Sequence, residues 1–98
     1  MSVEEMKITD NEFLRQFETE IDGELCIIEY SQQDRKIFLT KIKVSEKVLD
    51  KQNDFIEAVL SRISETNMRV VPTNPTIAGF MRKNRRKYKD LLPVGINI

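Results

Sequence analysis

The sequence of 98 residues contains no histidine and no tryptophan, and it has only one cysteine, three glycines and three prolines. The lack of histidine removes the commonest general acid–base group and the commonest metal ligand. A single cysteine, Cys26, cannot form an internal disulfide, so nothing points to an oxidising compartment. Because no paired-cysteine spacing and no carboxylate cluster is present, we predict no metal site.

The N-terminal stretch, residues 1–12, is acidic and lacks an apolar core, so we expect no signal peptide. No apolar run approaches the roughly 20 residues that a membrane-spanning helix needs. These features predict a cytoplasmic protein without membrane contact. Hydrophobic residues make up 40% of the chain and charged residues 33%. This balance predicts one globular domain over residues 1–98, with residues 1–10 and 94–98 as loose tails.

The net charge of zero hides an asymmetry between the two parts of the chain. Residues 1–66 carry 9 Lys or Arg against 15 Asp or Glu, whereas residues 67–98 carry 7 against 1. The basic part has three possible partners: an anionic ligand, a nucleic acid, or the acidic part of the same fold.

The segment Glu12–Ile21 alternates with a period of two, which predicts a half-buried strand with Phe13, Phe17 and Ile21 on one face. Asp22-Gly23 follows, and this dipeptide is typical of a tight hairpin turn that needs positive φ. As the first strand, this segment would have an exposed edge that permits dimerisation, so we expect a monomer or a homodimer.

Two further strands are predicted in the first half. Leu25–Tyr30 is rich in apolar residues and therefore more central, and Ser31–Arg35 is expected to be a turn. Ile37–Val44 is the third strand, in which one face is predicted to hold the alternating set Phe38, Thr40, Ile42 and Val44. The first half is therefore an antiparallel meander.

The period then changes to that of a helix. Apolar residues recur at helical spacing from Val48 to Ile63, with Ser45 or Asp50 as the N-cap and Asn67 in the left-handed conformation at the end. Met68–Val71 follows as a short strand. A helix between two strands usually makes them parallel neighbours.

Asn74 and Pro75 form a good start for a second helix, because asparagine caps the free N–H groups and proline lacks one. This helix should run from Pro75 to Asn84, and a short turn, Tyr88–Leu92, should follow. The predicted order is β-β-β-α-β-α, an α/β fold with a mixed sheet and two helices packed on it.

Three stretches in this order, FETEIDGELCIIEY, IFLTKIKV and FIEAVLSRISETNMRVVPTNPTIAGFMRKNRRKYKDLL, resemble the minimal, roughly hundred-residue members of the GCN5-related N-acetyltransferase superfamily. The resemblance covers Phe17 to Leu92. It implies that acetyl-CoA lies between the strands Ile37–Val44 and Met68–Val71, and that an acetyl group passes to the amine of a small molecule or a protein.

The resemblance also implies cofactor contacts. Backbone groups of Lys51, Gln52 and Asn53 would hold the pyrophosphate, and the pantetheine would lie against four further residues, Ile42, Val44, Val71 and Asn74. However, the family's Arg/Gln-x-x-Gly-x-Gly/Ala turn has no glycine here, in Ser45–Asn53. Non-glycine residues at positive φ, apolar side chains and a carboxylate would weaken CoA binding by roughly 10- to 10,000-fold. The alternative is a plain strand-to-helix connection.

Asn74 stands where many minimal relatives have a cysteine, so no thiol chemistry is expected there. Glu29 is the candidate general base and Tyr88, or Tyr30, the candidate acid. Each has a structural alternative. Glu29 would be a solvated strand residue, and Tyr88 would pack its ring against the second helix with its hydroxyl exposed. Cys26 is predicted to be a buried apolar residue.

The run from Arg82 to Lys89 has six basic residues in eight. It could bind a polyanion such as nucleic acid, anchor the 3′-phosphate of CoA as the resemblance implies, or be a solvated helix end where cations complement the dipole. Two functions therefore remain open. The protein is an N-acetyltransferase with an altered cofactor turn, or a non-catalytic binding module that lost acetyl-CoA.

Overall fold

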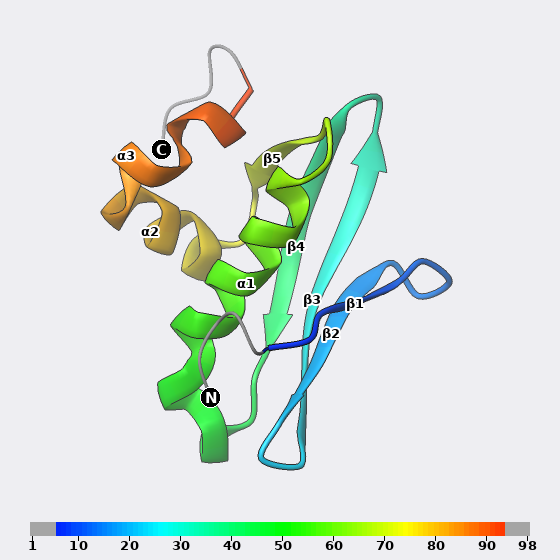
Figure 1. Cartoon of the computed structure of the whole chain (residues 1–98), viewed down its shortest axis with the longest axis vertical. Coiled ribbons are helices and arrows are strands. Elements are labelled where there is room, and N and C mark those ends of the chain that lie inside the picture. The colour runs from blue at the N-terminus through cyan, green and yellow to red at the C-terminus, as the bar shows by residue number, and fades with distance from the viewer. Residues whose placement is uncertain (1–5, 94–98) are drawn as a thin grey trace.

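The computed structural model describes residues 6–93. Its centre is a mixed five-stranded sheet in the order β1-β2-β3-β4-β5 (Figure 1). The strands are β1 (Thr9–Asn11), β2 (Gln16–Ile21), β3 (Glu24–Gln33), β4 (Lys36–Lys43) and β5 (Arg69–Pro72). The helices are η2 (Glu46–Lys51), α1 (Gln52–Ser64), α2 (Pro75–Lys83), α3 (Arg85–Tyr88) and η3 (Lys89–Leu91). Among the described residues, no helix is long and apolar enough to cross a bilayer.

The predicted meander and crossover are confirmed. Strands β1 to β4 are antiparallel, and α1 carries the chain to β5, which pairs with β4 in parallel. The predicted hairpin turn lies between β2 and β3, where Asp22 and Gly23 have φ of 50° and 80°. The mixed α/β architecture therefore follows the predicted order, with one extra strand, β1, and one extra short helix, α3.

Several boundaries differ from the prediction at the start of the chain. Residues 12–15 form a turn, not part of a strand, and Arg15 there has a φ of 54°. Phe13 is consequently 94% exposed, not buried. The expected loose tail is wrong for residues 6–10, because Met6 and Ile8 are buried in the core, while residues 1–5 and 94–98 lie outside the described part. β1 pairs with Gln16–Glu18 of β2, so the predicted exposed edge is wrong over these residues.

The second and third strands also differ in detail. Ser31–Gln33 continues β3, and the turn is reduced to Asp34 and Arg35. The register between β3 and β4 shifts where Glu29 faces Lys41 but Tyr30 faces Leu39, so that Thr40 is an extra residue. This bulge exchanges the two faces of β4, because each residue beyond it points the other way. The predicted set of Phe38, Thr40, Ile42 and Val44 on one face is therefore wrong.

α1 begins later than the apolar spacing predicts. Ser45 caps η2 by accepting a hydrogen bond from the N–H of Lys47, and Val48 has non-helical angles (φ −125°, ψ 23°). The prediction that Asn67 ends the helix in the left-handed conformation is wrong, because Asn67 has no positive φ. Instead, the hydroxyl of Thr66 donates to the carbonyl of Ile63 and accepts from the N–H of Met68.

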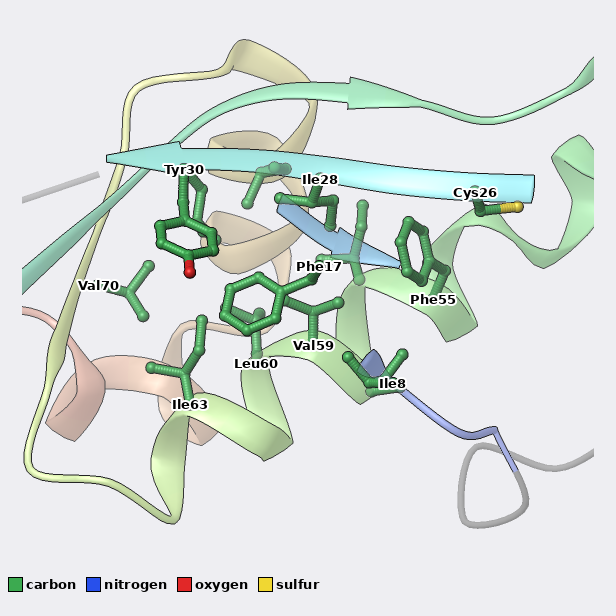
Figure 2. Packing of buried hydrophobic residues seen from close by; sticks show 14 of the residues in the cluster. Ile8, Phe17, Cys26, Ile28, Tyr30, Phe55, Val59, Leu60, Ile63 and Val70 are labelled. Atoms are coloured by element: carbon green, nitrogen blue, oxygen red, sulfur yellow. The ribbon is translucent and has the colours of Figure 1, made fainter. Parts of the chain in front are cut away.

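The core lies between one face of the sheet and the helices. Figure 2 shows Cys26, Ile28 and Tyr30 pointing from β3 toward Phe55, Val59 and Leu60 on α1. Ile77 and Met81 of α2, Tyr88 of α3 and Leu91 of η3 are buried in the same cluster. The helices therefore form one layer on one face of the sheet.

The other face of the sheet, called here the open face, has a different composition. It carries Glu18 and Glu20 from β2, Ile27 from β3, Phe38 and Lys43 from β4, and Val71 from β5, as the strand registers show. The apolar residues among them are partly exposed and do not belong to the core cluster or to the residues packed against it. No helix within residues 6–93 covers this face.

Candidate functional site

The strands β4 and β5 diverge where the resemblance places a cofactor. The last residue pair is Leu39 with Pro72, and β4 continues for four residues beyond it, from Thr40 to Lys43. The carbonyl of Leu39 accepts hydrogen bonds from the N–H groups of Thr73 (3.2 Å) and Asn74 (3.0 Å) and from the hydroxyl of Thr73 (3.1 Å). This concentration of donors turns the chain away from β4 and into α2. The second half of β4 is thus free of β5.

Asn74 occupies the start of α2 as predicted. Its side-chain oxygen accepts hydrogen bonds from the N–H groups of Thr76 at 2.9 Å and Ile77 at 3.2 Å, so the predicted N-cap is confirmed. Pro75 is the first residue of the helix. The cap uses the oxygen of the amide, so any contact of this side chain with a ligand would have to use its nitrogen.

At the start of α1, where a diphosphate would bind, the first backbone donor is engaged within the chain. η2 leads directly into α1, and the N–H of Gln52 donates to the carbonyl of Leu49. Lys51, the residue before the helix, makes no side-chain cap and has negative φ (−97°). Asn53 is exposed and Asp54 places a carboxylate in the first turn. A phosphate site at a helix start needs free N–H groups that the ligand can approach closely.

Further carboxylates lie along η2, which leads into this start. The hydroxyl of Ser45 donates to Glu24 of β3 at 2.7 Å, which holds the Glu24 carboxylate at the beginning of η2. Glu46 and Asp50 are exposed within the same helix. Lys47 and Lys51 offset only part of this charge. This excess of negative charge disfavours a diphosphate near η2.

The candidate pantetheine residues lie on two sides of the sheet. Ile42 and Val44 are half-buried and pack against the core. Val71 is paired with Phe38 and lies on the open face. The free second half of β4 fits an extended, amide-containing arm, because such an arm can pair with a strand edge. The backbone edge of β4 is thus the feature that fits such an arm, since Ile42 and Val71 lie on opposite faces of the sheet.

The two candidate catalytic residues are not brought together. Glu29 lies on the open face, where its carboxylate is 3.8 Å from the ammonium of Lys43. Tyr88 lies in the helix layer on the other side of the sheet, with its ring 5.8 Å from that of Phe80 in α2. The prediction that Tyr88 packs on the second helix is confirmed. However, its hydroxyl is buried, not exposed, and has no hydrogen-bond partner among the described residues.

The surroundings of Tyr88 were not predicted. It lines a cavity of about 910 Å³ between the last turns of α1 and the chain around Met68, Arg69 and Leu91. Burial raises the pKa of Tyr88. Lys87 bonds to Glu57 of α1, which raises the pKa of Lys87. This cavity lies toward the end of α1, away from Gln52, so Tyr88 is also remote from the candidate cofactor contacts. No motif in the sequence marks it.

The two remaining candidates are structural. Tyr30 is buried, packs on Phe17 at 4.8 Å and donates to Asp10 at 2.6 Å. Its burial and this hydrogen bond raise its pKa. Cys26 is fully buried as predicted, and burial raises the pKa of its thiol. No group of His, Cys, Asp and Glu side chains within residues 6–93 is arranged to hold a metal ion.

The fold and the diverging strands agree with a comparison against protein families. The family model described as GCN5-related N-acetyl-transferase matches residues 16–91. A search of curated proteins gives no match to the chain. The matched range begins with β2 and ends with η3, so it includes the meander, the crossover through α1 and the divergence of β4 from β5. The chain therefore belongs to the GCN5-related N-acetyltransferase family.

Proposed function

We propose that this protein is a binding module with the acetyltransferase fold, and that it does not transfer acetyl groups efficiently. The start of α1 carries this proposal. The N–H of Gln52 is engaged with Leu49, and carboxylates of Glu24 and Asp54 stand at η2 and in the first helical turn. Like charges close to a diphosphate disfavour its binding.

The positions of the candidate catalytic residues support the same proposal. A general base and a general acid act on one substrate only when both lie within hydrogen-bond reach of it. Glu29 and Tyr88 are on opposite sides of the sheet, and the ammonium nearest to Glu29 is that of Lys43.

The ligand that we propose for the module is a polyanion. Four cationic side chains, called here the basic surface, are exposed on α2, α3 and η3: Arg82, Lys83, Arg86 and Lys89. A hollow of about 480 Å³ is lined by Arg82, Lys83, Asn84, Arg85, Arg86 and Lys87, with no carboxylate among them. Clustered cations without an intervening carboxylate attract phosphate backbones.

A salt titration of binding tests the basic surface. The probe is a fluorescent DNA duplex of about 20 base pairs, measured by anisotropy between low and physiological salt. If all four cations neutralise phosphates, the slope of log affinity against log salt should be roughly −3.6, because each neutralised phosphate contributes about −0.9. The double variant Arg82→Gln with Arg86→Gln should reduce it to roughly −1.8.

The matched control removes two exposed lysines elsewhere, Lys36 and Lys47, and should leave the slope unchanged. Absence of binding at low salt would overturn the proposal. Equal weakening by the control variant would overturn it too, because binding would then follow net charge and not the basic surface.

Slow acetyl transfer to an amine is a second candidate function. The observation in its favour is the free second half of β4, which the described helices leave open to an extended arm. Acetyl-CoA would supply the thioester, and transfer would depend on proximity alone.

A thermal-shift titration decides between the candidates. A ligand at 100 times its Kd adds about 2.7 kcal/mol to the free energy of unfolding. We expect no shift with acetyl-CoA at about 1 mM, the upper end of the usual range of KM values.

A further inference from the structure

The open face is exposed over the width of the central strands. Leu25 is 62% exposed, and Ile27 and Phe38 are partly exposed. The link between β1 and β2 is only the turn of residues 12–15, so no helix is inserted there to cover the face. Exposed apolar residues surrounded by charged ones are typical of an interaction surface.

Charges are arranged in register across this face. Glu18, Ile27 and Lys43 are paired in one row, so a carboxylate lies one strand to one side of Ile27 and an ammonium one strand to the other. We propose that two copies of this chain associate through their open faces, around a two-fold axis that passes over Ile27 and runs within about 15° of the strand direction.

This axis makes the rows complementary. Rotation about it places β2 of one copy over β4 of the other, so Glu18 meets Lys43 of the other copy, and the reverse contact forms as well. Ile27 meets its own copy on the axis. Glu29 also lies near the axis, but its carboxylate is 3.8 Å from Lys43 of its own chain, which reduces the repulsion between the two copies. A two-fold interface requires this self-complementarity.

Further along the strands, the apolar residues of the open face are complementary to those of the other copy. Gln16, Glu29 and Lys41 form the next row on the same face, and Ser31, Phe38 and Val71 form the row after it. The turn of residues 12–15 extends beyond the Gln16 end of β2, at the level of this last row. The turn holds Phe13, 94% exposed, and Leu14, 56% exposed, and it projects away from α2 and α3 (Figure 1). The same rotation brings this turn over β4 and β5 of the other copy. The exposed Phe13 and Leu14 thereby gain an apolar partner surface.

The pairing of residues between the two copies is kept at the usual angle between packed sheets. Face-to-face sheets cross at about 30°, and strands lie about 4.8 Å apart, so a residue one strand from the axis is displaced by roughly 2.4 Å. Residues on one face repeat every ~6.6 Å, which is larger than the displacement. Glu18 therefore still meets Lys43 rather than its neighbours.

The size of the face limits the area that a dimer can bury. Four strands, β2 to β5, with the eight residues of β4 as the length, cover about 19 Å by 26 Å, roughly 500 Å² in projection. Standard interfaces bury ~800 Å² per partner, so we expect a weak, reversible dimer with a micromolar Kd.

Sedimentation velocity of the full chain over a range of concentrations tests the dimer. Glu18→Lys and Lys43→Glu each put like charges into both reciprocal contacts, and each alone should raise Kd by about tenfold or more. A mixture of the two variants forms a heterodimer in which both contacts again join opposite charges. The mixture should therefore dimerise within about threefold of the wild-type Kd.

The mixture separates an interface effect from misfolding, because neither chain is altered by mixing. Matched controls are Glu65→Lys and Lys47→Glu, which change net charge equally at exposed sites outside the open face. Both should keep the wild-type Kd. A wild-type chain that stays monomeric at about 1 mM would overturn the proposal. So would single variants that dimerise normally, a mixture that stays monomeric, or controls that weaken association as strongly.

Discussion

Replacing Asn74 with alanine should lower the free energy of unfolding by about 1–2 kcal/mol, the upper part of the range for loss of an N-cap. The side-chain oxygen accepts from the N–H groups of both Thr76 and Ile77, so two donors lose their partner. α2 has only nine residues and buries Ile77 and Met81. For a domain of this length the melting temperature should fall by roughly 5–15 °C.

Chemical and thermal unfolding of a small variant set measure this effect. Asn74→Asp keeps the acceptor and adds a negative charge at a helix start, so its stability should equal or exceed that of the wild type. Asn74→Ala should shift the denaturant midpoint with an unchanged m value. The reasoning is refuted if the alanine variant is as stable as the wild type, or if aspartate destabilises as much as alanine.

Other substitutions probe the core and the turns. Tyr30→Phe should cost about 1.5–3 kcal/mol, because the hydrogen bond to Asp10 is lost, and urea unfolding measures it. The pKa of Tyr30 is raised in the folded state, so the unfolded state releases this proton first. The wild type should therefore lose stability as pH rises above about 10, and the phenylalanine variant should lose less. Cys26→Ser should lower the free energy of unfolding by about 1–3 kcal/mol, measured by thermal unfolding, because a hydroxyl replaces a fully buried thiol. Cys26→Ala should lower it less, because alanine brings no hydroxyl into the core. Asp34 has a φ of 56°, and Asp34→Gly should gain roughly 0.5–1 kcal/mol. Leu60→Ala should cost about 2–5 kcal/mol, because it opens a cavity in the core, and a smaller loss would mean that the surroundings collapse around it.

The elements with strong local signals could be predicted from the sequence. Asp22-Gly23 demands positive φ, and Asn74-Pro75 combines a cap with a residue that lacks an N–H, so neither needs tertiary information. The apolar spacing from Phe55 to Ile63 predicts a helix for the same reason. The crossover rule then makes β4 and β5 parallel.

Features that depend on distant contacts could not be predicted. β1 has three residues, too few for a period, and forms because it pairs with β2. Val48 and Leu49 fit the helical spacing, yet Val48 has non-helical angles and kinks η2, so α1 begins only at Gln52. The bulge at Thr40 has no marker in the sequence and reverses the faces of β4.

In the candidate site, too, a local feature could be predicted from the sequence and the spatial arrangement could not. The absence of glycine between Ser45 and Asn53 already predicts a poor phosphate turn, and the engaged N–H of Gln52 agrees with that. Sequence spacing could not reveal that Glu29 and Tyr88 lie on opposite sides of the sheet. The position of Tyr88 depends on the turn at Asn84, between α2 and α3.

The central claim is that the start of α1 does not accept a diphosphate. Amide chemical shifts of the ¹⁵N-labelled chain during a titration with CoA test it directly, with pantetheine as the control that lacks the diphosphate. We expect the amides of Gln52, Asn53 and Asp54 to show no saturable shift up to about 1 mM, where a dissociation constant corresponds to only ~4 kcal/mol of binding free energy. Saturable shifts of these amides with CoA but not with pantetheine, at a Kd well below that concentration, would contradict the account.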